Sequence, residues 1–153
     1  MANWIGASRT NYVRLADGVT QESLEAEFER IGLDIEVSPG QGKNVDKVCF
    51  LPSDFSGDGS FQSYLFPDPS EDASDDEEFT WADHVMPHVA VGEVLVMVCA
   101  GAEKLRYVTG YAEAFVRLES GEVKQTEVSI TDIYGKASEV FSVDKGCITE
   151  TEY

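Results

Sequence analysis

Apolar spacing in the first third of the chain predicts a strand followed by a helix. Residues 10–15 alternate loosely between polar and apolar positions, which favours a strand. Thr20 is suited to cap a helix, and Glu22 would complement the exposed N–H groups of its first turn. Gly32 favours the end of this helix, because glycine readily adopts the left-handed conformation found there. The buried face is predicted from three residues at helical spacing: Leu24, Phe28 and Ile31.

Two short apolar segments follow and are predicted to form a hairpin with a long tip. Residues 33–37 alternate between apolar and polar side chains, which is typical of a strand with one face in water. Residues 47–51 indicate a second short strand. The segment between them contains three turn-forming residues: Pro39, Gly40 and Gly42.

The second half of the chain predicts three consecutive strands. Residues 93–99 form an apolar run without alternation, which favours a strand at the centre of a sheet. Residues 106–118 indicate a second long strand and residues 123–130 a third, with the hairpin signal Ser120-Gly121 between them. Residue Ile148 hints at a final strand near the C-terminus.

Two further helices are predicted, one before these three strands in the sequence and one after them. The first is short, and Pro87 disturbs it because proline removes a backbone hydrogen bond. Its apolar residues are Trp81, Val85 and Val89. The second would be capped by Ser129 or Thr131 and would contain Ile133, Tyr134 and Ala137.

The order of these elements predicts an α+β fold. We expect a mainly antiparallel sheet of about five to six strands, with two to three helices on one face. With 153 residues and 42% hydrophobic residues, the chain is long enough for one core, so residues 1–153 are expected to form a single α+β domain.

Residues 67–78 break the pattern and predict a long, exposed acidic loop. The segment, PDPSEDASDDEE, has no apolar residue larger than alanine. It lies in a longer stretch, from position 48 to position 102, that contains no lysine or arginine but eleven acidic residues. The whole chain carries 29 acidic against 11 basic residues, a net charge of −18.

This uneven charge favours binding to a basic protein surface. Crowded carboxylates repel one another, and a cationic partner would relieve that repulsion. The same field disfavours direct binding to nucleic acid or to an anionic membrane. The alternative is a solvated acidic loop without a partner. The predicted partner-binding residues are Asp68, Glu71, Asp72, Asp75, Asp76, Glu77, Glu78, Phe79 and Trp81.

No sequence pattern indicates an enzyme or a cofactor, and the one candidate metal motif is incomplete. No phosphate-binding loop, nucleophile elbow or dinucleotide fingerprint occurs. His84 and His88 are four residues apart, a spacing used by zinc sites on helices, but Val85 stands where the metalloprotease pattern has glutamate. A small metal-dependent module centred on these histidines therefore remains an alternative to the binding hypothesis.

The cysteines and the N-terminal segment favour a cytoplasmic protein. Cys49, Cys99 and Cys147 are odd in number and widely spaced, which disfavours a disulfide framework. Cys49 and Cys99 lie in apolar runs and are expected to be buried. No signal peptide or membrane span is predicted.

Two stretches resemble known sequences: ASRTNYVRL at residues 7–15 and GEVLVMVCAGAEKLRYVTGYA at residues 92–112. They are similar to small, poorly characterised accessory proteins of plasmids and phages. The resemblance implies an anti-defence role, because several anti-CRISPR and anti-restriction proteins are small and acidic and inhibit by imitating nucleic acid. We therefore expect an inhibitor of a nucleic-acid-binding defence complex. The alternative is an immunity protein that neutralises a cationic toxin, which would use the same acidic surface on a different partner.

Overall fold

The described residues of the chain form six strands in two sheets and three α-helices, which confirms the predicted α+β class. A computed structural model of the chain describes residues 4–53, 59–65, 77–103 and 107–149. The strands are β1 (Trp4–Thr10), β2 (Ile35–Pro39), β3 (Val48–Pro52), β4 (Val94–Glu103), β5 (Tyr107–Arg117) and β6 (Val123–Ser129). The helices are α1 (Gln21–Arg30), α2 (Trp81–His84) and α3 (Asp132–Phe141), with 3-10 turns η1 (Gly42–Asn44), η3 (Met86–His88) and η4 (Lys145–Cys147).

The larger sheet has the strand order β1-β4-β5-β6, and all its neighbours are antiparallel. The apolar strand β4 lies inside it, between β1 and β5, as the lack of alternation predicts. Leu95, Met97 and Cys99 point to the buried face of β4, whereas Val94 and Val98 point to the opposite face and are about half exposed. One face of this sheet is therefore packed, and the described residues leave the other face open.

The first strand begins and ends earlier than the predicted span of residues 10–15. Strand β1 ends at Thr10, and the Asn11 side chain then replaces the backbone by donating to Val94 O (2.9 Å) and accepting from Val96 N (2.7 Å). The chain next crosses to the smaller sheet, where Val13 exchanges two backbone hydrogen bonds with Val48. The loose alternation at residues 10–15 reflects this crossing between sheets.

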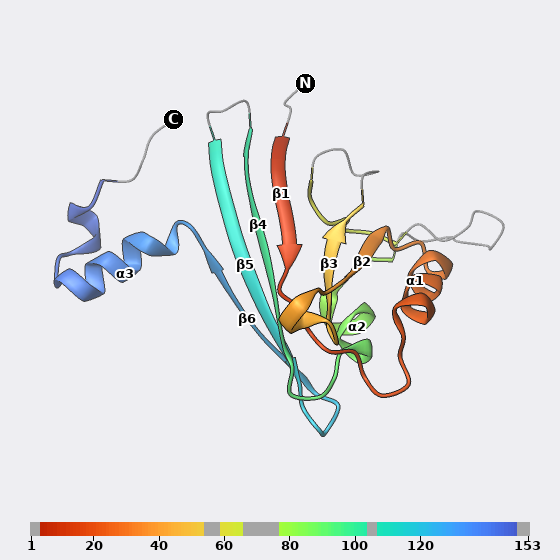
Figure 1. Cartoon of the computed structure of the whole chain (residues 1–153). Coiled ribbons are helices and arrows are strands. Elements are labelled where there is room, and N and C mark those ends of the chain that lie inside the picture. Colours follow the sequence, from red (N-terminus) through yellow and green to blue (C-terminus); the bar gives the residue numbers. More distant parts are fainter. Residues whose placement is uncertain (1–3, 54–58, 66–76, 104–106, 150–153) are drawn as a thin grey trace.

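The smaller sheet, β2 and β3, packs with α1 and α2 against the buried face of the larger sheet (Figure 1). The predicted hairpin of residues 33–37 and 47–51 is confirmed as β2 and β3. The Thr10 hydroxyl links the two layers, because its oxygen accepts the Phe50 backbone N–H at 2.8 Å. Cys49 and Cys99 are buried as predicted, and all three cysteines are free thiols.

The predicted start and end of the first helix are confirmed. The Thr20 hydroxyl accepts the Ser23 N–H, and the Ser23 hydroxyl oxygen accepts the Thr20 N–H, so the two residues form a capping box. Gly32 follows the helix with φ of +70°, a left-handed conformation that glycine adopts without strain. Leu24 and Phe28 are buried on the inner face of the helix.

Helix α3 does not pack on the side of the other helices, contrary to the prediction of helices on one face. It leaves the end of β6 and projects away from the layer of α1, α2, β2 and β3 (Figure 1). None of its ten residues is buried. The final strand predicted at Ile148 is also wrong, because that residue follows η4 and pairs with no strand in the part of the chain that the structure describes.

Two carboxylates face each other across β5 and β6 on the side of the packed face. Glu113 pairs in register with Glu127. Burial, together with the Glu127 charge, raises the pKa of the Glu113 carboxyl above its usual value. Ionisation of Glu113 therefore costs folding free energy as the pH rises through this raised pKa, and the cost is absent below the unfolded value.

We expect Glu113→Gln to stabilise the protein at neutral pH. The free energy of unfolding should rise by about 0.2–1 kcal/mol at pH 7, the range for a like-charge cross-strand pair on a partly solvated surface. The gain should disappear near pH 3, where the carboxyl is protonated in both states. Urea unfolding at the two pH values measures this. An equal gain in the matched variant Glu122→Gln, in the exposed turn after β5, would contradict the local explanation.

Candidate functional site

The predicted acidic loop, residues 67–78, is called the acidic segment below. The chain on its two sides is joined together at the surface of the protein body. The Leu65 N–H donates to Glu77 O at 2.8 Å, and the Phe79 N–H donates to Ser63 O at 2.9 Å. Tyr64 and Glu78 lie between these bonds as an antiparallel bridge. Residues 63–65 and 77–79 thus form a short two-stranded structure, which we call the base. The chain leaves the base at Leu65 and returns to it at Glu77, so these two points are neighbours.

Buried aromatic side chains hold this base in place. Phe79 and Trp81 are 8% and 6% exposed, and their rings meet edge to face at a centroid distance of 5.4 Å. Trp81 also contacts Phe61 at 4.8 Å and Phe50 at 6.1 Å, so the cluster reaches strand β3. Leu65, from the other side of the base, is buried in the same core.

The predicted role of Phe79 and Trp81 in partner binding is therefore corrected. Their rings are enclosed by other core side chains and offer almost no surface to a partner. An aromatic residue beside a charge run fits an interface anchor and a core residue equally well in sequence. The structure assigns both residues to the core, where they anchor the end of the acidic segment.

A capped helix follows the base directly. The Thr80 hydroxyl oxygen accepts the Asp83 N–H at 3.1 Å, and the Thr80 O–H donates to Asp83 Oδ2 at 2.7 Å. The His84 ring lies over the same turn, with Nδ1 3.0 Å from Thr80 O. The Nε2 atom of His84 lies 3.6 Å from Glu77 Oε1, so this histidine ties the acidic segment to α2.

Two of the predicted acidic residues lie in the described part of the chain. The Glu77 side chain is 73% exposed, and Glu78 is exposed as well. Neither forms an ion pair with a lysine or arginine among the described residues. The other predicted acidic residues lie outside the described residues: Asp68, Glu71, Asp72, Asp75 and Asp76.

Glu93 belongs to the same lysine-free and arginine-free stretch but is neutralised from elsewhere in the chain. Its carboxylate accepts a 2.8 Å hydrogen bond from Arg14 Nε and lies 2.6 Å from Arg14 Nη2. Burial raises the pKa of Glu93, but the hydrogen bonds and charge of Arg14, with the charge of Lys47, outweigh it and leave the pKa below its usual value. Glu93 therefore does not add to an uncompensated surface.

We expect Arg14→Gln to destabilise the protein at neutral pH. The free energy of unfolding should fall by about 1–2 kcal/mol, because a carboxylate with a side chain only 15% exposed loses its charged partner. The pKa of Glu93 is depressed in the folded state, so this stabilisation is present above the unfolded value near 4.3 and is lost as the pH falls through the folded value.

Urea unfolding of the Arg14→Gln variant at pH 7 and at pH 3 checks this prediction. Arg30→Gln is the matched control, because Arg30 pairs with Glu27 between neighbouring turns of α1 at a more exposed position. The control should change the free energy of unfolding by less than about 0.5 kcal/mol. A loss in Arg14→Gln that persists unchanged at pH 3 would contradict the role of the Glu93 charge.

Comparisons with protein families, with curated proteins and with solved structures return no match.

The two histidines turn toward different neighbours. His84 contacts Phe79 and Glu77, whereas the His88 ring meets Phe28 of α1 at a centroid distance of 6.4 Å. Helix α2 ends at His84, and His88 belongs to η3, so the four-residue spacing does not place both rings on one helix face. Within the described residues, no three histidine, cysteine or acidic side chains are grouped closely enough to hold a metal ion.

The sequence did not reveal Ser63, Tyr64 and Leu65 as the partner strand of the base. These residues carry no charge, and they lie between Phe61-Gln62 and Phe66-Pro67, which do not form a strand pattern. Apolar residues that include Phe61, Tyr64 and Leu65 predict only that this stretch is held against the protein body, and the structure buries Leu65 in the core.

Proposed function

We propose that this protein is an inhibitor that binds a basic, nucleic-acid-binding surface of a defence complex, in the manner of anti-CRISPR or anti-restriction proteins that imitate DNA. The acidic segment would occupy lysines and arginines that otherwise hold phosphates. The protein would act by binding, without catalysis or cofactor, and would not contact nucleic acid itself. We place this activity in the cytoplasm, where free thiols such as the three cysteines persist.

The observation that carries this proposal is the segregation of charge along the chain. Positions 48–102 hold eleven acidic residues and no lysine or arginine, and six of the acids fall between Glu71 and Glu78. At physiological ionic strength an exposed charge acts over about 8 Å. Six carboxylates within eight positions therefore reinforce one another at a single cationic surface, as successive phosphates of DNA do.

The anchored base supports the same proposal. Its hydrogen bonds, from Leu65 N–H to Glu77 O and from Phe79 N–H to Ser63 O, hold the chain on the two sides of the acidic segment at one place. A partner would therefore contact the charges of this segment at a single site. Core packing already orders the base, so binding does not have to supply that ordering free energy.

No helix in the described part of the chain is long and apolar enough to cross a membrane.

Displacement of DNA tests the proposal directly. Purified CRISPR effectors and restriction enzymes are loaded with fluorescently labelled duplex DNA, and the protein is titrated while anisotropy is recorded. We expect release of the DNA at about 0.05 M salt and much weaker release at about 0.5 M salt, where the Debye length is shorter. Binding to the labelled DNA alone, without the target, would contradict the proposed mechanism.

A further inference from the structure

The larger sheet has an apolar outer face that no described part of the chain covers. This outer face is defined by the side chains of β1, β4, β5 and β6 that point away from β2, β3 and α1. Its large residues are Val94, Val98, Val128 and Ile130, which are 46–52% exposed. Small residues lie between them and leave the face hollowed. Ala100, Gly110 and Ala112 line a depression of about 210 Å³.

Strand β6 contributes two large apolar residues to or beside the outer face. Its residues Gln125 and Glu127 point to the side of the core, whereas Val128 and Ile130 point outward. A water-facing sheet surface ordinarily carries the polar residues of each strand. Val128 and Ile130 make the end of β6 next to α3 apolar on the outer face, whereas Lys124 and Thr126 are the outward residues at its other end. An exposed apolar patch of this kind is typical of an interaction site.

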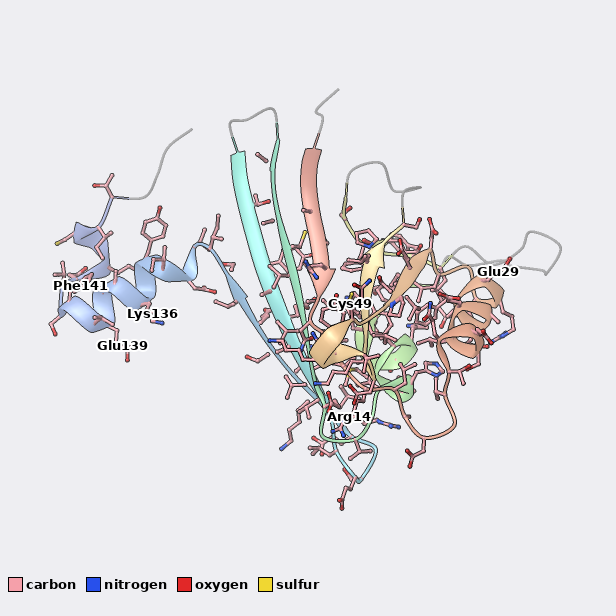
Figure 2. All side chains as sticks on the ribbon, in the orientation of Figure 1. Arg14, Glu29, Cys49, Lys136, Glu139 and Phe141 are labelled. Carbon is pink, nitrogen blue, oxygen red and sulfur yellow. The ribbon has the colours of Figure 1, made fainter. Side chains whose placement is uncertain are left out.

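Helix α3 carries a second apolar surface that no described element covers. Its apolar residues recur at helical spacing and form one face, while Asp132, Lys136 and Glu139 lie on the opposite side. Three large residues of the apolar face are 58–71% exposed: Ile133, Val140 and Phe141. Figure 2 shows Phe141 on the projecting part of α3, away from the sheet.

This helix lacks the features that would stabilise it alone. It has ten residues, contains Gly135 at its middle and has no side-chain hydrogen bond at its Thr131 cap. Helices of this length are marginal in water and gain most of their stability from packing of their apolar face. Among the described elements, α3 packs mainly against the short η4, so its stability requires another surface.

The exit from β6 keeps α3 away from its own sheet. The Ile130 N–H still donates to Gly110 O at 2.9 Å, and the Ser129 N–H donates to Asp132 Oδ2 at 2.5 Å. Only Thr131 therefore separates residues that are fixed in the sheet and in the helix. Folding α3 back over the outer face of the same chain would break these bonds.

We propose that two copies of this chain form a dimer in which α3 of each copy packs on the outer face of the other. This inference goes beyond the proposed inhibitor function and does not depend on it. A reciprocal exchange of this kind covers both unpartnered surfaces with one symmetric contact.

Charge favours a second copy as the occupant. The charged side chains that point to the outer face in the described residues are Arg9 and Lys124, both positive. The chain as a whole carries a charge of −18, so most of its surface repels another copy. Because no acidic side chain points to the outer face in the described residues, a contact there avoids the repulsion that the rest of the surface would exert on a second copy.

The available area is also sufficient. Each copy presents seven large apolar side chains, four on the outer face and three on α3, all at least 46% exposed. Burying one such side chain removes roughly 60–120 Å² of apolar surface, so each copy would bury roughly 400–800 Å² before its alanines are counted. Stable interfaces bury about 800 Å² on each partner.

Sedimentation equilibrium in a reducing buffer tests the dimer, because the reductant prevents a disulfide through the exposed Cys147. We expect the wild-type protein to sediment at twice its 16.8 kDa mass, at low and at high salt. Phe141→Asp and Val98→Asp should each weaken association at least about 100-fold. Val45→Asp, at a 76% exposed site outside both surfaces, should leave the dimer unchanged. A wild-type monomer, or a dimer that survives Phe141→Asp, would overturn the proposal.

Mixing the two weakened variants tests the exchange itself. In a mixed dimer of Phe141→Asp and Val98→Asp, both substitutions fall in one half of the interface and the other half is intact. A tagged Phe141→Asp chain should therefore retain untagged Val98→Asp, although neither variant binds itself. If the sheets instead packed face to face, mixing would restore nothing, and the reciprocal exchange would be rejected. Circular dichroism confirms that each variant is folded.

Discussion

Neutralising the acidic segment should reduce affinity for a basic target at least about 100-fold, because electrostatic steering and attraction are lost together. The change replaces six acidic residues by glutamine or asparagine: Glu71, Asp72, Asp75, Asp76, Glu77 and Glu78. The variant should no longer displace labelled DNA from a nuclease that the wild-type protein inhibits. Its thermal midpoint should stay equal or rise, because the neighbouring carboxylates repel one another.

A second variant with the same net charge separates local from overall electrostatics. It neutralises six exposed acids elsewhere on the molecule: Glu29, Glu36, Asp46, Glu119, Glu122 and Glu139. We expect this control to retain at least most of the inhibition measured by anisotropy. Equal loss of inhibition in both variants would show that total charge, and not the acidic segment, determines binding.

Trp81→Ala should cause the largest loss of stability, about 3–5 kcal/mol in the free energy of unfolding. The Trp81 ring contacts Phe50, Phe61 and Phe79, so its removal leaves a cavity where the base of the acidic segment meets strand β3. The expected fall in the thermal midpoint is about 6–20 °C for a chain of this size. Urea and thermal unfolding measure both quantities.

Tyr64→Ala is the matched control for this prediction. Tyr64 is also aromatic and also belongs to the base, but it is 49% exposed. Its truncation should change the free energy of unfolding by no more than about 0.5 kcal/mol. Similar losses in the two variants would argue against the aromatic cluster as the anchor.

Local patterns in the sequence predicted most of the elements. The helix capped by Thr20 and ended at Gly32 depends on neighbouring residues alone, and the structure has it at the predicted place. Strand β4 was recognisable because a strand that lies inside a sheet and packs on a core carries an unbroken apolar run.

The missed features depend on contacts between distant residues. The start of β1 at Trp4 follows from pairing with β4, and its end follows from the Asn11 side chain, which bonds residues more than eighty positions away. Phe79 and Trp81 were placed at a surface because adjacency to acidic residues does not reveal a ring's neighbours. The exposed face of α3 was likewise invisible, since its apolar spacing also fits a helix packed on its own sheet.

The closed base of the acidic segment has a consequence for how this protein could diversify. Because Leu65 and Glu77 are already joined, the chain leaves the base and returns to it at neighbouring points, and closing a flexible insertion there costs only about 0.6 kcal/mol more for each doubling of its length. The core residues that hold the base lie outside this interval. We therefore expect insertions between positions 65 and 77 to leave the contacts of the base and of its aromatic cluster unchanged, so that selection by a changing target could act there while the scaffold stays constant.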